Sequence, residues 1–165
     1  AVECDPCSTE LCYEWDFTID ARGWTVWSTG GRPFGVYVQG VGWQCTWNEV
    51  TGAGFDNRVY IEKINMPATF ASIRYEVDVV STGGGLARSG SMRGVIGTTN
   101  QTAVFLPAYT QGQTETLSVD LSDAGLDGIR LSMATDTLAP DQDAITVKRI
   151  RIYYTGNSPT GGAAC

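Results

Sequence analysis

Apolar and polar residues alternate along much of this chain, and this two-residue period is the strongest constraint on its fold. The clearest example is segment 71–79. Its apolar face contains Ala71, Ile73, Tyr75, Val77 and Val79, and its polar face contains Ser72, Arg74, Glu76 and Asp78. Successive side chains of a β-strand point to opposite faces of the sheet, so the pattern predicts a strand with one buried face. The sequence contains no long segment with the 3.6-residue period of a helix.

The same alternation returns in short segments separated by turns, and the chain contains 20 glycines. We predict an all-β fold of about nine or ten short strands, arranged as an antiparallel β-sandwich. Segments 92–98 and 102–106 are predicted to form a hairpin, and 121–126 a brief helical turn.

Two irregularities are also predicted. In the last strand, 144–154, the alternation changes phase at Lys148 and Arg149, which is typical of a β-bulge. Gly40 and Gly42 interrupt the β pattern, and glycines at this spacing usually mark a bulge or a close backbone approach.

The length of 165 residues fits one domain. We expect a cysteine-rich leader at 1–12, the β-sandwich at 13–155 and a linker-like tail at 156–165. The five cysteines are Cys4, Cys7, Cys12, Cys45 and Cys165. Zinc is disfavoured because the chain has no second ligand pair and no histidine. Disulfides formed in an oxidising, extracellular compartment are favoured, with the chain ends tied to each other or to the body, although spacing does not fix the pairing.

Charge and composition exclude several functions. The formal net charge is −7 with only two lysines, which disfavours nucleic acid and anionic membrane surfaces. No apolar run is long enough to span a membrane. The absence of histidine excludes Ser-His-Asp and Cys-His catalysis. The carboxylate pairs Glu14/Asp16, Glu115/Asp120 and Asp141/Asp143 are explained by strand edges or turns, so we expect no enzyme.

Segment 23–47 holds four of the five tryptophans. Such a cluster forms either part of a core or a stacking surface for a flat ligand. Trp15 and Trp24 follow the apolar phase of their strands and are predicted to lie in the core. Trp27 is out of phase with Trp24 and is predicted to face the other way.

Five elements of the chain share their pattern with one known group of domains. They are the strand Tyr13-Glu14-Trp15-Asp16-Phe17, the Gly23-Trp24 pair, the Gly-x-Gly-Trp element at 40–43, the strand end Ser81-Thr82-Gly83-Gly84, and the closing pattern Ile145-x-Val147-x-x-Ile150-x-Ile152. Together they resemble the galactose-binding-like jelly-roll domains, which include many non-catalytic carbohydrate-binding modules. The resemblance covers nearly all of 13–154.

The resemblance implies a site in which an exposed tryptophan or tyrosine stacks on the apolar face of a sugar. Trp27 is the first candidate, followed by Tyr37 and by Tyr109, which lies beside Gln111. The full predicted ligand-binding set is Trp27, Tyr37, Trp47, Tyr109, Gln111 and Arg88. Trp47 shares a strand face with Trp43 and Cys45, so it belongs to the core if that cysteine is in a buried disulfide.

Arg88 and Arg93 flank a glycine–serine loop, where they are either ordinary surface arginines or contacts for an acidic sugar. The resemblance further implies a structural calcium ion held by acidic residues near the first and last strands. The predicted metal ligands are Glu14, Asp16, Asp141 and Asp143. Oxygen ligands suit calcium. The family usually has acids in the closing strand where this chain has lysine and arginine.

Three functions remain from the sequence. The favoured one is a non-catalytic module that binds a polysaccharide or glycan in a secreted or surface protein. The alternative is a structural or adhesion module of a cell surface, filament or virion, joined to neighbouring modules or subunits through its cysteines. A small secreted hydrolase is the least favoured.

Overall fold

The computed structural model describes residues 10–28, 34–46, 58–82, 88–107, 112–135 and 144–165. These residues form thirteen strands and no helix. The strands are β1 (Leu11–Asp16), β2 (Thr25–Ser28), β3 (Phe34–Val38), β4 (Gly42–Thr46), β5 (Arg58–Lys63), β6 (Phe70–Thr82), β7 (Arg88–Ile96), β8 (Thr99–Asn100), β9 (Val104–Phe105), β10 (Thr114–Asp120), β11 (Gly128–Thr135), β12 (Ala144–Gly156) and β13 (Ala163–Ala164).

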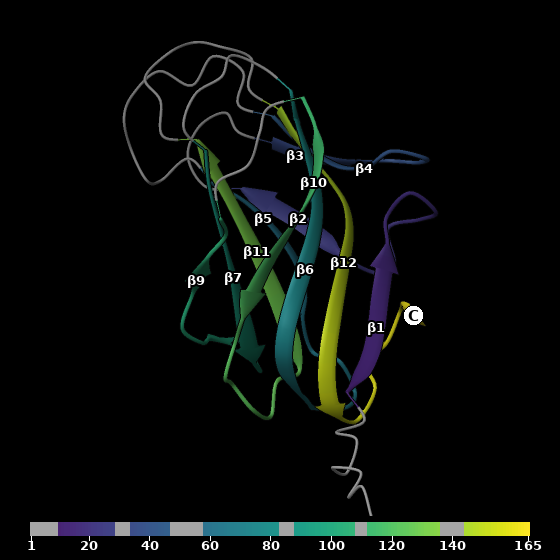
Figure 1. The fold of residues 1–165 in the computed structure, drawn as a ribbon, viewed down its shortest axis with the longest axis vertical. Helices are drawn as coiled ribbons and strands as arrows, with labels where there is room; N and C mark the ends of the chain where they lie inside the picture. Colours follow the sequence, from purple (N-terminus) through teal and green to yellow (C-terminus); the bar gives the residue numbers. More distant parts are fainter. Residues whose placement is uncertain (1–9, 29–33, 47–57, 83–87, 108–111, 136–143) are drawn as a thin grey trace, which may run out of the picture.

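The strands form two antiparallel sheets that face each other, so the predicted β-sandwich is confirmed (Figure 1). We call them sheet A and sheet B. Sheet A has the order β10-β6-β12-β1-β13, and β4 joins it through β12 while β3 pairs with β4. Sheet B has the order β2-β5-β11-β7-β8, and β9 also pairs with β7. The two longest strands, β6 and β12, lie side by side along the length of the molecule (Figure 1).

The core lies between the sheets and is rich in aromatic rings. Trp15 and Trp24 are buried, as predicted, with their ring centroids 5.4 Å apart in an edge-to-face arrangement. Phe17 makes edge contacts with both Trp24 and Trp43. Edge-to-face pairs of this kind add stabilisation beyond the area they bury.

Segment 71–79 differs from the prediction at one position. Tyr75 is buried as expected, but Ile73 is 44% exposed and Ser72 is buried in its place. The register explains the difference, because Arg74 pairs with Tyr153 while Ser72 pairs with the next residue of β12. Ile73 is therefore an extra residue in β6, and the faces of the strand exchange there.

The bulge predicted in the last strand is confirmed by a register shift between Val147 and Arg149. The predicted close approach is found beside it. Gly42 has a φ of +125°, and a Cβ atom at this position would overlap the carbonyl oxygen of Val147. Only glycine satisfies both conditions at this point.

Gly42→Ala is expected to lower the free energy of unfolding by at least about 2 kcal/mol, because the methyl group meets backbone that cannot rotate away. Gly40→Ala is the matched control. Gly40 also has a positive φ, +79°, but nothing lies within 4 Å of the point that its added methyl group would occupy. Urea unfolding of both variants measures the difference, and equal losses would contradict a steric role for Gly42.

Two smaller expectations concern turns. The hairpin after β7 is present, but its turn lies earlier than predicted, at Gly97 and Thr98, because β8 already pairs with β7 at Thr99. The helical turn predicted for 121–126 does not form. Leu126 instead makes an isolated bridge to Phe70 and is buried.

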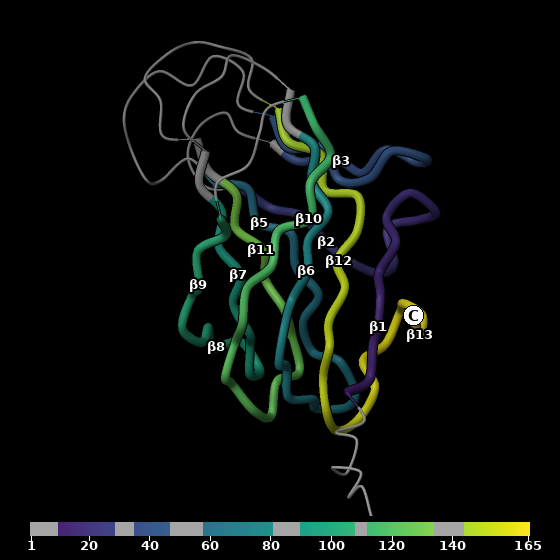
Figure 2. The backbone as a smooth tube through the Cα atoms, viewed as in Figure 1, coloured from purple at the N-terminus to yellow at the C-terminus, as the bar shows by residue number. Residues whose placement is uncertain are grey.

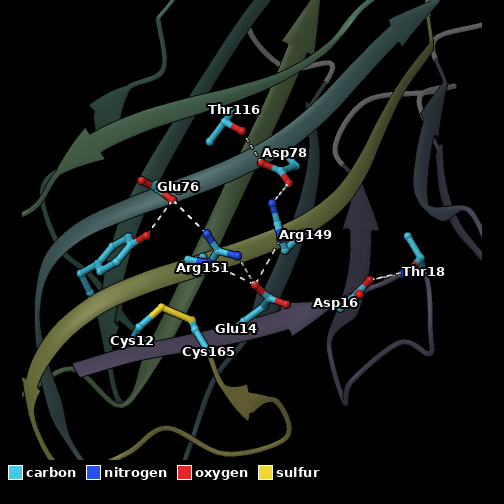
Figure 3. A network of polar contacts seen from close by, with 11 residues as sticks. Cys12, Glu14, Asp16, Thr18, Glu76, Asp78, Thr116, Arg149, Arg151 and Cys165 are labelled. Atoms are coloured by element: carbon cyan, nitrogen blue, oxygen red, sulfur yellow. Dashed lines mark hydrogen bonds and ion pairs between the residues drawn. A yellow bond between two sulfur atoms is a disulfide. The ribbon is translucent and has the colours of Figure 1, made fainter. Parts of the chain in front are cut away.

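The C-terminal residues 156–165 also differ from expectation, because they fold back on the domain instead of forming a linker. β13 pairs with the edge of β1 (Figure 2). A disulfide joins Cys12 to Cys165 (Figure 3). The indole Nε1 of Trp15 donates to the carbonyl of Thr160 at 3.0 Å. The expected tie between the ends of the chain is thus confirmed. The expected boundary between leader and sandwich falls inside β1.

Cys45 is a buried free cysteine beside Trp43 in β4, so no disulfide organises this part of the core. Burial raises the pKa of its thiol to about 12. The side chain is therefore an uncharged thiol at neutral pH and packs as a small apolar group.

Candidate functional site

One row of side chains crosses the outer face of sheet B, the face turned away from the core. The β-ladder aligns them in the order Trp27, Tyr60, Ser132, Ser91 and Phe105. Aromatic rings thus stand at both ends of the row and two small serines lie between them. Trp27 is 40% exposed and Phe105 is 69% exposed.

Trp27 is held in place by its cross-strand neighbour. Its ring stacks on that of Tyr60, with centroids 4.1 Å apart and an interplanar angle of 14°. The guanidinium carbon of Arg130 lies 5.4 Å from the Trp27 ring centroid, within the range of a cation–π contact. One ring face rests on Tyr60 and the Arg130 guanidinium lies over the ring, yet 40% of the residue remains exposed. The indole is an oriented, accessible platform.

A second row beside the first carries charge. In register it contains Thr25, Glu62, Arg130 and Arg93. The Nε of Arg130 donates to Glu62 at 2.5 Å, and its Nη1 donates to the side-chain oxygen of Asn100 at 2.6 Å. Aromatic surface and fixed polar groups therefore lie together on this face, which is the combination that recognises a ring bearing hydroxyl groups.

The outer face of sheet A carries a different arrangement (Figure 3). Glu14 is paired with Arg149 at 3.4 Å and with Arg151 at 2.6 Å. Arg149 also pairs with Asp78, and Arg151 lies 3.7 Å from Glu76. These charges satisfy one another within the chain. With Arg74, which lies 3.6 Å from Glu76, three guanidinium groups face three carboxylates, so the sheet A network is an internally neutralised surface.

The same contacts bear on the predicted calcium ligands. Glu14 accepts hydrogen bonds from two guanidinium groups, whose positive charges oppose a cation at this point. Oδ1 of Asp16 already accepts from the backbone and hydroxyl groups of Thr18. Asp141 and Asp143 lie outside the described residues. Within the described ranges, no group of three or more acidic or cysteine side chains is placed to hold a metal ion.

Tyr37 is half-buried in β3 and packs edge-on against Trp43. Its hydroxyl is enclosed and has no hydrogen-bond partner among the described residues. Desolvation, with a smaller contribution from the Asp20 carboxylate, raises the pKa of this hydroxyl. Tyr37 thus packs against the core at Trp43, on sheet A, whereas Trp27 lies on the outer face of sheet B. Of the other predicted ligand-binding residues, Trp47, Tyr109 and Gln111 lie outside the described residues. Arg88 begins β7, but its side chain is not among those described.

Sequence reasoning missed four members of this surface, namely Tyr60, Glu62, Arg130 and Phe105. Each lies on the outward-facing side of its strand. Alternation predicts that side, but it does not tell which residues of different strands are neighbours. The relevant signal is the strand order, which only the structure provides.

The two facing antiparallel sheets define the class of fold, a β-sandwich, and solved structures share it. A crystal structure of Clostridium thermocellum endo-1,4-beta-D-xylanase 10B, containing CBM22-1 and GH10 modules with xylohexaose, matches with a TM-score of 0.54 and 18% identity. The match covers 90% of this chain and 29% of that chain. A point mutant of a family 29 carbohydrate-binding module matches with a TM-score of 0.49 and 16% identity, over 88% of this chain and 93% of that one.

No protein-family description and no curated protein matches the sequence. The likeness therefore establishes the fold, and the function has to be argued from the residues. No helix in the described residues could cross a membrane.

Proposed function

We propose that this chain is a non-catalytic carbohydrate-binding module that binds a polysaccharide on the outer face of sheet B. The observation that carries the proposal is the exposed Trp27 ring, stacked on Tyr60 beside the fixed polar groups of Glu62, Arg130 and Asn100. A rigid indole offers a sugar ring a large apolar contact at a small cost in conformational entropy. The polar row supplies donors and acceptors for hydroxyl groups.

The carboxylates support a non-catalytic role. Glycoside hydrolysis needs two carboxyl groups that flank one bond. Glu115 and Asp120 lie in β10 five positions apart, so they project from opposite faces of the strand. Glu14 is engaged by two arginines and Glu62 by Arg130, so both carboxylates already have partners within the chain.

Trp27→Ala is expected to weaken binding to the recognised polysaccharide at least about fivefold, since one stacked aromatic contributes roughly 1–3 kcal/mol. Affinity electrophoresis against a panel of soluble polysaccharides identifies the ligand, and isothermal titration calorimetry with oligosaccharides measures the loss. The matched control is Tyr153→Ala. Tyr153 is an aromatic residue of sheet A, and the guanidinium carbon of Arg74 lies 4.0 Å from its ring centroid.

The control variant should bind like the unmodified protein. Equal weakening in both variants would place the effect in the fold rather than in the site. Wild-type binding that survives Trp27→Ala unchanged would exclude the outer face of sheet B as the binding surface.

A structural calcium ion is a separate proposal that rests on the resemblance alone. Because Glu14 is bound by arginines, the ion would be held by Asp16 together with Asp141 and Asp143. On this proposal, calcium chloride raises the melting temperature of the EDTA-treated protein, Asp16→Asn removes the rise, and Glu14→Gln preserves it. An unchanged melting temperature in the wild-type protein would reject the calcium site.

An extracellular location is proposed as well, supported by the Cys12–Cys165 disulfide, since such bonds persist in oxidising compartments. The structural-module alternative relied on cysteines as joints between modules. Cys165 is already paired within the chain, so a joint would have to use Cys4 or Cys7, which lie outside the described residues.

A further inference from the structure

Two arginines stand directly opposite each other on the outer face of sheet B. Arg93 of β7 pairs in register with Arg130 of β11. Like charges in this position repel each other and destabilise a sheet. A protein with a net charge of −7 has few cations to place, and only 11 lysines and arginines in all. Placing two of these cations opposite each other is unfavourable unless another group compensates the repulsion between them.

The two guanidinium groups are not equally satisfied. Arg130 is bound to Glu62 at 2.5 Å and to Asn100 at 2.6 Å. Arg93 is half-buried, and no carboxylate among the described residues is paired with it. Its Nε atom is buried without a hydrogen-bond partner in the described structure. A half-buried guanidinium group without a counter-charge is unfavourable, and an external anion that binds its accessible part would stabilise it.

Among the described residues, a second buried donor beside Arg93 also lacks a hydrogen-bond partner. Ser91, two residues before Arg93 on the same face of β7, is buried, and its hydroxyl also lacks a partner in the described part of the chain. Glu62, Arg130 and Arg93 together carry one net positive charge. This charge lies next to the row that runs from Trp27 to Phe105. Because β2 and β7 are three strand spacings apart, about 14 Å, a polysaccharide that runs along the row from Trp27 would bring a further sugar unit near Arg93.

We propose that the site selects a polysaccharide whose sugar units carry an anionic group, and that Arg93 is the residue that recognises it. A guanidinium group binds a carboxylate or a sulfate ester through two parallel, charge-assisted hydrogen bonds. The bound anion also compensates the repulsion between Arg93 and Arg130. This inference rests on the proposed carbohydrate-binding function and adds the chemical class of the ligand.

The test compares ligands that differ only in charge. Calorimetry measures binding of an oligogalacturonide and of its fully methyl-esterified, neutral form, with a sulfated galactan oligosaccharide as the second anionic source. The wild-type protein is expected to bind an anionic oligosaccharide at least about tenfold more tightly than the neutral ester. Sodium chloride should reduce this preference by screening. Comparing uronate with sulfate identifies the source of the anion.

Arg93→Gln is expected to reduce the preference to below about threefold, mainly by weakening binding of the anionic oligosaccharide. Arg74→Gln, on sheet A, is the matched control and should keep the preference. Melting temperatures of both variants verify that they fold. If Arg93→Gln does not fold, Arg93→Lys replaces it, because lysine keeps the charge but loses the bidentate geometry, and the preference should again fall.

The outcomes separate the two proposals. Equal wild-type affinity for the charged and neutral forms, or binding to neutral glycans alone, would overturn the role of Arg93 and leave the carbohydrate-binding function standing. A preference that persists in Arg93→Gln would also overturn it. Failure of the wild-type protein to bind any glycan would overturn the proposed function, and the inference with it.

Discussion

Trp15→Ala is expected to lower the free energy of unfolding by about 4–5 kcal/mol, close to the whole stability of an ordinary domain. Trp15 is 0% exposed, and its ring lies edge-on against both Tyr13 and Trp24. Its indole nitrogen also donates to the carbonyl of Thr160. Alanine would leave a large cavity between the sheets and an unsatisfied carbonyl in the C-terminal segment. Urea unfolding followed by circular dichroism measures the loss.

Trp27→Ala is the control for this substitution, because the same side chain is removed from an exposed position. Its loss should not exceed about 1.5 kcal/mol, the contribution of one aromatic pair. If the two variants unfold at the same urea concentration, the core position of Trp15 would be contradicted.

Loss of the Cys12–Cys165 disulfide is expected to lower the free energy of unfolding by about 2–5 kcal/mol. The bond joins residues 153 positions apart. It therefore removes much of the conformational freedom of the unfolded chain, and chain-entropy estimates increase with loop length. The double variant Cys12→Ala/Cys165→Ala avoids leaving a new free thiol, and its urea midpoint gives the effect.

Unfolding in the presence of a reductant is the control for the double variant, because it breaks the same bond without changing the sequence. Dithiothreitol should shift the urea midpoint of the wild-type protein toward that of the double variant and leave the double variant unchanged. Identical midpoints for oxidised and reduced wild-type protein would show that the bond contributes nothing to stability.

Much of the fold follows from local pattern. The alternation predicted the strands, the burial of Trp15 and Trp24, and the exposed position of Trp27. The bulge near Lys148 was visible as a change of phase, because an inserted residue moves every later side chain to the other face. The exchange of faces at Ile73 was not visible. Its neighbours allow either phase, and pairing with β12 selects one.

The C-terminal segment was misread because its small residues resemble those of a linker. Its structure depends on two distant contacts, the disulfide to Cys12 and the hydrogen bond from Trp15. The candidate site also depends on contacts between residues that are far apart in the sequence. Trp27 is a local prediction, whereas the opposition of Arg93 and Arg130 is a matter of register between strands far apart in sequence.

The short strand β13 has a consequence for how the domain behaves in concentrated solution. Without it, the outer edge of β1 would present free backbone N–H and C=O groups, which can pair with an extended segment of another molecule. Two residues, held by one covalent bond, occupy that edge. The bond between the chain ends therefore protects against aggregation as well as unfolding, and chains that have not yet oxidised are the population at risk.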